Sequence, residues 1–229
     1  NALHVDGGNS SVGINTTGAS DASLQINDTV SLIKMLDTDD NTFSRMYHSA
    51  GNFLIDVDKG NSGGDSYFQV GIDDTQMLKI DTIGAMTLPK QPAFQAQPSG
   101  VQSNIGDNDT IEFATEIFDQ NADYNNSTFT FTAPVTGKYL VSGNVRIDNL
   151  DLTGDPYHSL VIVTSNRAYY NLVSSNNWDA DAQYFFFSIT VLADMDANDT
   201  VYLRYQENCS AADQADVSTS SYFSAHLAC

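Results

Sequence analysis

The sequence predicts an all-β protein, and its acidic residues, its turn formers and its alternating patterns all favour this class. Only three of the 29 acidic residues are glutamate, so nearly all are aspartate, which favours turns over helices. The 229 residues include 15 Gly, 11 Tyr and 12 Phe, a balance typical of strands and turns, and are 41% hydrophobic, enough for a buried core. In VYLRYQ, Val201, Leu203 and Tyr205 share one face, as in a half-buried strand.

The charge balance excludes some classes of partner. A net charge of −20 with nine widely scattered Lys and Arg residues argues against nucleic acid and against an anionic membrane surface. No apolar run approaches the length of a membrane span, so we expect no membrane insertion. The chain begins at Asn1 without methionine, and we expect that a preceding segment has been removed. Two explanations of the charge stay open, solubility in a salty medium and binding of divalent cations.

Residues 1–88 are predicted to form short strands separated by turns. Runs such as LHV, VGI, SLIKML, NFLIDV and YFQVGI alternate with turn clusters such as DGGNSS and KGNSGGD. Strands this short bury little surface alone and leave unpaired edges. We therefore expect three identical chains wound together as a fibre shaft. The alternative is a small independent β-sandwich.

A domain boundary is predicted near Leu88. The segment TLPKQPAFQAQPSG contains Pro89, Pro92 and Pro98, and such clustering is typical of a stiff, extended connection. This divides the chain into a shaft-like trimerising region, 1–88, and a head, 89–229.

The head is predicted to be a two-sheet jelly roll, because long strands follow one another without helices. In TFTFTAPVTGKYLVSG, Phe129 and Phe131 are expected to share one face of a strand. Pro134 and Gly137 then form a corner, and alternation resumes at Tyr139. The run YFFFSITVL is apolar at both parities, which predicts burial inside the sandwich or against another subunit.

Two resemblances to known families follow from these motifs. The stretch LHVDGGNSSVGINTTGASDASLQI resembles a repeated segment of bacteriophage tail-fibre and tail-spike proteins, which implies a virion component. Residues 92–228 resemble the globular head of complement component 1q, itself similar to tumour necrosis factor, in the order PAFQA, EIFDQNADYNNSTFTFTAPVTGKYLVSG, ADMDANDTVYL and SYFSAHLA. That resemblance implies a ten-stranded jelly roll that assembles as a homotrimer. Ala225, where the family usually has glycine, and the loop NNSTF depart from the pattern.

No motif indicates catalysis, and we expect a protein that is not an enzyme. No phosphate loop, His-Glu-x-x-His or Gly-x-Ser-x-Gly occurs. His158 and Ser159 are adjacent in a predicted strand, so their side chains point to opposite faces. Cys209 and Cys229 are either free or bonded to each other.

No cofactor is established by the sequence, but calcium is a hypothesis. The run DMDAND lacks the central glycine and terminal glutamate of a calcium loop. Calcium-binding members of the complement-like family take ligands from the loop before the strand equivalent to FFSITV. By that resemblance Asp181 matches the ligand position, with Asp179 close by. The alternative is a solvated acidic loop.

The receptor-binding prediction centres on the only tryptophan. Trp178 lies in the polar loop SSNNWDADAQ, where an aromatic ring more often offers a flat face to a sugar or partner than packs in a core. Neighbouring segments add candidates, with the alternative that Tyr169 or Tyr170 packs at a subunit interface. The predicted receptor-binding residues are Trp178, Asn177, Tyr157, Arg167, Tyr169 and Tyr170.

Together these patterns predict a trimeric fibre or spike protein of a bacteriophage, located on the virion surface. Its partners would be other virion proteins and a host-surface receptor, a glycan or a protein. One alternative is a trimeric decoration, cement or head-fibre protein of the capsid. A second is a secreted carbohydrate-binding module.

Overall fold

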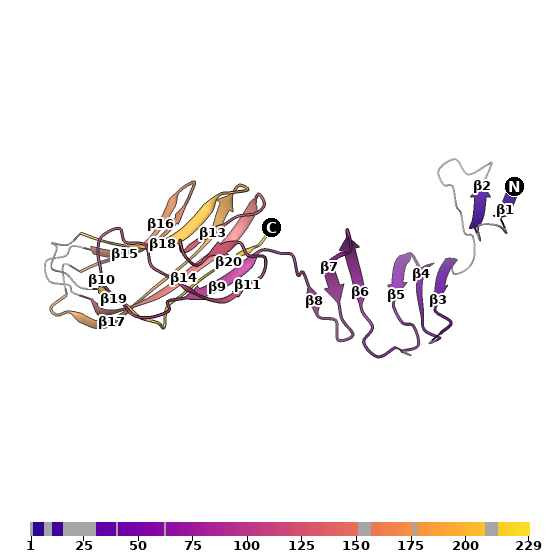
Figure 1. Cartoon of the computed structure of the whole chain (residues 1–229), viewed down its shortest axis with the longest axis horizontal. Helices are drawn as coiled ribbons and strands as arrows, with labels where there is room; N and C mark the ends of the chain where they lie inside the picture. The colour runs from indigo at the N-terminus through magenta and orange to yellow at the C-terminus, as the bar shows by residue number, and fades with distance from the viewer. Residues whose placement is uncertain are drawn as a thin grey trace. The chain divides into compact units, whose positions relative to one another are not determined.

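Every assigned element of the protein is a β-strand, which confirms the all-β class (Figure 1). The computed structural model describes residues 2–6, 11–15, 31–39, 41–61, 63–150, 157–175, 178–208 and 215–229. Within these ranges no helix has the length and hydrophobicity to span a bilayer. The chain divides into two compact units, Asn1–Leu88 and Pro89–Cys229.

The N-terminal unit consists of small antiparallel sheets. One hairpin and two three-stranded sheets follow each other along the chain, each built from strands adjacent in sequence. The hairpin is β1 (Ala2–Asp6) with β2 (Ser11–Asn15); the first sheet is β3 (Ser31–Leu36), β4 (Phe43–Ser49) and β5 (Asn52–Asp56), and the second is β6 (Phe68–Ile72), β7 (Thr75–Ile80) and β8 (Met86–Thr87).

This unit has no core of its own in the part that the structure describes. Between residues 33 and 88, no residue whose exposure is described is buried. Large apolar side chains are open to solvent instead: Phe53 is 70% exposed, Ile72 58% and Met86 65%. The sheets therefore hold together through backbone pairing and part-buried contacts alone.

The head is a sandwich of two antiparallel sheets. Seven strands form the first sheet, in the order β10-β19-β14-β20-β9-β11, with β17 also paired to β14. Five strands form the second, in the order β12-β13-β18-β15-β16. The strands are β9 (Ala93–Gln97), β10 (Gln102–Ile105), β11 (Thr115–Asp119), β12 (Tyr124–Asn125), β13 (Thr130–Thr132), β14 (Gly137–Leu150), β15 (Tyr157–Thr164), β16 (Ala168–Ser174), β17 (Ala182–Met195), β18 (Thr200–Glu207), β19 (Ala215–Val217) and β20 (Tyr222–Leu227).

The predicted corner is the point where the chain crosses from one sheet to the other. Strand β13 belongs to the five-stranded sheet and β14 to the seven-stranded sheet, so the residues from Pro134 to Thr136 bridge the two layers. The hydroxyl of Tyr139 donates to the carbonyl oxygen of Val135 at 2.8 Å and closes the corner. Tyr139 and Val141 are fully buried on one face of β14, which confirms the predicted alternation after the corner.

The predicted strand face shared by Phe129 and Phe131 is wrong for Phe129. Phe131 is fully buried in β13, whereas Phe129 lies in the preceding turn with φ of 59°. The β12–β13 hairpin has to reverse direction between Asn125 and Thr130, and a left-handed residue makes that reversal possible.

A stack of aromatic rings joins the two sheets of the head. The ring of Phe94 on β9 stacks on those of Tyr124 and Phe131 in the opposite sheet, with centroids 4.4 Å and 5.1 Å away. Phe223 on β20 meets Phe94 edge-on at 5.0 Å. The hydroxyl of Tyr124 donates to the carbonyl oxygen of Phe113 at 2.9 Å, and burial raises the pKa of Tyr124 above its usual value.

The first strand of the head begins, and the last strand ends, at the same end of the sandwich. The amide of Leu227 donates to the carbonyl oxygen of Pro92, and the amide of Lys138 to that of Cys229. We call this the terminal end. Strand β14 runs from there to Leu150, which pairs with Ala182 at the opposite end.

We expect Phe94→Ala to lower the free energy of unfolding of the head by about 3–5 kcal/mol, because it removes a buried ring and leaves a cavity between the sheets. Phe118→Ala is the matched control, since Phe118 is 49% exposed. Chemical denaturation at one protein concentration measures both variants. Equal losses would contradict the central role of the Phe94 stack.

Candidate functional site

Trp178 lies at the end of the sandwich opposite the termini. Its amide donates to the carbonyl oxygen of Ser175 at 3.0 Å, which forms a turn after β16. The indole is 39% exposed and its inner side meets the Phe185 ring, with centroids 5.7 Å apart. Tyr157 pairs with Ser174 and therefore lies at this same end. We call this region, defined by Tyr157 and Trp178, the Trp178 end.

The remaining predicted receptor-binding residues do not gather there. Arg167 lies beyond the other end of the seven-residue strand β16, roughly 20 Å along the strand, and its guanidinium pairs with Asp194 at 2.8 Å. Tyr169 packs against the core, whereas Tyr170 points outward and is 56% exposed. Asn177 lies outside the described residues.

The two candidate calcium ligands, Asp179 and Asp181, are both exposed beside Trp178. Among the residues that the structure describes, no three His, Cys, Asp or Glu side chains come together as a metal site. Two carboxylates supply fewer oxygens than the six to eight that calcium prefers. The calcium hypothesis therefore requires carbonyl oxygens, water molecules or ligands from other subunits.

The local geometry of the sheets explains why neighbouring polar residues do not form a catalytic pair. His158 is buried, and its Nδ1 lies 2.7 Å from the hydroxyl of Tyr205 and 3.8 Å from the carboxylate of Glu207. Ser159 turns to the opposite face, where its hydroxyl donates to the carbonyl oxygen of Asn171. The prediction that His158 and Ser159 point apart is confirmed. Cys229 is free and exposed, whereas Cys209 lies outside the described residues.

Several exposed apolar side chains lie on the outer side of the seven-stranded sheet. On β17, every second residue from Phe185 onward is buried or partly buried, while Tyr184, Phe186 and Leu192 are 57%, 54% and 57% exposed. Leu140 pairs with Leu192, and the guanidinium of Arg146 lies over the Tyr184 ring at 4.3 Å. We call this surface the exposed sheet face. In the sequence, the two-sided apolar run YFFFSITVL, which starts at Tyr184 and ends at Leu192, signalled this face.

One cavity of the head was not predicted from the sequence. A cavity of about 550 Å³ lies beside the β12–β13 hairpin and is lined in part by Asp123, Asn126 and Asn198. Burial, and secondarily the carboxylate of Asp119, raise the pKa of Asp123 above its usual value. A raised pKa means that the folded state binds the proton more tightly, so ionisation of Asp123 at neutral pH destabilises the fold. In sequence, Asp123 signals only a turn.

Comparison with known proteins identifies the head. The family model described as "C1q domain" matches residues 93–228, more than half of the chain. No curated protein is significantly similar in sequence.

Three solved structures are similar to about three fifths of this chain. The globular domain of zebrafish complement 1qA is 14% identical, over 61% of this chain and 98% of that one, with a TM-score of 0.46. Murine APRIL is 12% identical, over 60% and 99%, with a TM-score of 0.44. Eiger TNF from S. frugiperda is 12% identical, over 61% and 92%, with a TM-score of 0.43.

If calcium binds beside Trp178, millimolar Ca²⁺ will raise the melting temperature and excess EDTA will reverse the rise. A ligand present at 100 times its Kd stabilises the folded state by about 2.7 kcal/mol. Asp181→Asn should abolish the response, whereas Asp65→Asn, in the N-terminal unit, should keep it. A melting temperature indifferent to chelation would exclude the calcium hypothesis.

Proposed function

This chain belongs to the C1q domain family, and from that membership we propose that it is a trimeric bacteriophage fibre or spike whose head binds a receptor on the host surface. Domains of this family are typically trimeric and are generally binding modules rather than enzymes. The receptor class that we propose is a surface glycan.

The observation that carries this proposal is the lack of buried residues in the described part of the N-terminal unit. A folded unit normally buries apolar side chains to offset the loss of conformational entropy. Here Phe53, Ile72 and Met86 stay exposed on small sheets, and a hollow of about 630 Å³ with a mixed polar and apolar lining lies between residues such as Ile55 and Tyr67. Two further copies of the chain would cover these faces, which is how a fibre shaft is built.

The exposed sheet face supports the same assembly in the head. Tyr184, Phe186 and Leu192 project from one face of β17, and Tyr222 on β20 is 39% exposed on the same sheet. Apolar surface of this kind usually marks a protein interface. Polar residues interrupt it, with the hydroxyl groups of Ser142 and Thr190 2.8 Å apart. A homotrimer would bury this face and leave the five-stranded sheet outside.

The assignment to a virion rests on the N-terminal sequence. The segment that resembles phage fibre repeats forms, in its described part, the β1–β2 hairpin, with Ala2 paired to Asn15. Such hairpins and short sheets are compatible with an extended stalk, which would carry the head away from the particle. The virion surface is therefore the location that we propose.

We expect the protein to be a trimer in solution, and Phe186→Glu to convert it to monomers by placing a charge on the exposed sheet face. Val135→Glu is the control, because Val135 is 46% exposed in the corner before β14 and outside that face. Light scattering after gel filtration measures both masses. A wild-type monomer at micromolar concentration would reject the trimer and favour the secreted binding module.

Antibody labelling of intact virions and whole-cell binding test the function itself. We expect label on the tail and saturable binding of fluorescent trimer to host cells. Trp178→Ala should weaken that binding at least several-fold if the Trp178 end contacts the receptor, and Val135→Ala, in the corner before β14, should not. Label over the capsid would instead indicate the decoration protein, and unchanged cell binding would remove Trp178 from the site.

A further inference from the structure

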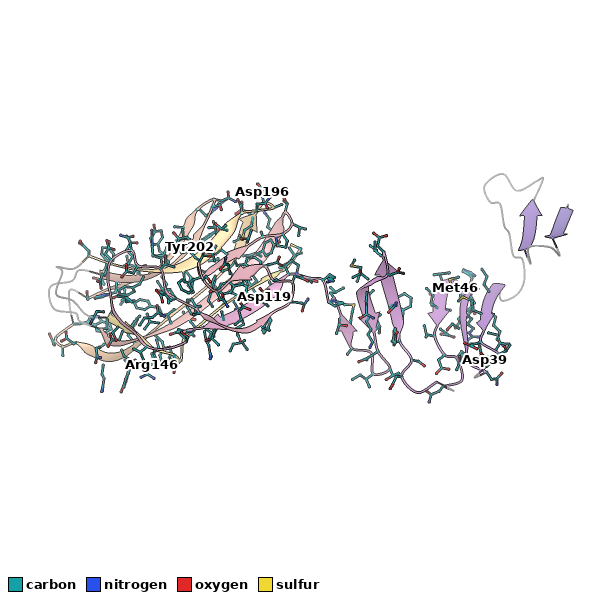
Figure 2. All side chains as sticks on the ribbon, in the orientation of Figure 1. Asp39, Met46, Asp119, Arg146, Asp196 and Tyr202 are labelled. Atoms are coloured by element: carbon teal, nitrogen blue, oxygen red, sulfur yellow. The ribbon has the colours of Figure 1, made fainter. Side chains whose placement is uncertain are left out.

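We propose that the outer surface of the five-stranded sheet holds a binding site for a carboxylate-bearing sugar, centred on Arg204. This inference rests on the proposed receptor-binding function and specifies the class of receptor. The site lies on the sheet that the proposed trimer leaves outside, away from the exposed sheet face. Figure 2 labels Tyr202 and Arg146, which belong to the two different sheets.

Strand register places Arg204 in a row of side chains that faces outward. Val161 on β15 pairs with Tyr170 on one side and with Arg204 on the other. Directly paired residues project on the same face of a sheet, so the three side chains form one row. The row spans about 10 Å, from two inter-strand spacings of about 4.8 Å.

Burial of Val161 shows that this row is closely packed. Leu160 and Ile162, its neighbours on β15, belong to the core between the sheets, whereas Val161 does not. Val161 nevertheless has no exposed surface. The residues that the register places beside it are Tyr170 and Arg204, so we infer that their side chains close over it. The stem of Arg204 is thereby held in place before any ligand arrives.

The guanidinium of Arg204 lacks both an acceptor for its Nε and an ion pair among the described residues. Its Nε is buried and has no hydrogen-bond acceptor among the described residues. The other three arginines each pair with an aspartate: Arg45 with Asp56, Arg146 with Asp148 and Arg167 with Asp194. Arg204 forms no ion pair within the described part of this strongly acidic chain.

A carboxylate is the anion that best matches a guanidinium group. Because Nε itself has no accessible surface, a ligand would meet the two outer amino groups of the guanidinium, and an anion there would pair a cation that has no ion pair within the described residues. The planar guanidinium can bind both oxygens of a carboxylate at once, which a lysine cannot do.

Rings beside Arg204 favour a sugar as the bearer of that carboxylate. Tyr170 is 56% exposed, and Leu172, its neighbour on the same face of β16, is 54% exposed. Tyr202 stands two residues from Arg204 on the same face of β18. Flat aromatic surfaces of this kind pack against the apolar faces of sugar rings.

An acidic peptide fits less well. Strand β15, in the middle of the row, is paired on both sides, with β16 and β18, so it has no free backbone edge beside Arg204 for strand addition.

Binding of defined oligosaccharides to the full-length trimer tests the site. The probes are oligomers of galacturonic acid and of sialic acid, with galactose oligomers of equal length as the neutral comparison, measured by titration calorimetry at two salt concentrations. We expect at least one acidic oligomer to bind ten-fold or more tightly than the neutral one, and its affinity to fall as salt rises.

Variants then assign the binding to Arg204. Arg204→Gln should weaken acidic-oligomer binding at least ten-fold, and Tyr170→Ala several-fold. Arg204→Lys keeps the positive charge but cannot bind both carboxylate oxygens at once, so it should retain only part of the affinity. This variant tests the site even if Arg204→Gln folds poorly. Lys90→Gln changes the net charge equally and should bind like wild type. Trimer mass and melting temperature are checked for each variant.

Three results would overturn the inference: no binding of either acidic oligomer, equal binding by Arg204→Gln and wild type, or equal affinity for a polyglutamate peptide. Cell binding separates this failure from failure of the proposed function. If the labelled trimer still binds host cells while the acidic oligomers do not bind, only the Arg204 site is rejected. If the trimer binds no host cell, the proposed function itself fails.

Discussion

An apolar sheet face has to be covered, and this requirement organises the whole molecule. In the head, two sheets cover each other, and the stack of Phe94, Tyr124 and Phe131 fills the space between them. Strand β17 also exposes Tyr184, Phe186 and Leu192 on its outer face, and the described part of the N-terminal unit exposes side chains such as Phe53 and Ile72. Within the described residues, the strands are therefore paired inside one chain, whereas large apolar side chains remain uncovered. We propose that association of three chains covers the exposed apolar side chains of both units.

Much of the fold followed from local patterns. The strands around the corner were predictable because Pro134 and Gly137 interrupt an otherwise regular alternation, and the buried parity of β14 followed directly. The course of the chain at that corner did not follow, because passage between two sheets depends on pairing with β18 and β17, which lie far along the sequence. Phe129 was misplaced for a related reason: alternation continues through the residue, but the hairpin has to reverse there.

The site was less predictable than the fold, because it depends on which strand ends meet. Trp178 and Tyr157 do lie at one end of the sandwich, although 20 residues separate them in sequence, since β15 and β16 form a hairpin. That same hairpin sends Arg167 to the other end. Arg204 drew no attention in the sequence, where it is one polar residue in an alternating strand. The structure shows that, within the described residues, Arg204 has no aspartate partner of the kind that the other three arginines have.

The shared position of Pro92 and Cys229 at one end of the sandwich has a practical meaning for engineering. A reporter, affinity handle or surface linker joined after Cys229 would emerge on the side where the head's own chain enters. The loops around Trp178 would then stay clear of the graft. Immobilised in this orientation, the head would present its opposite tip to the medium, which suits it as a capture reagent on sensor chips.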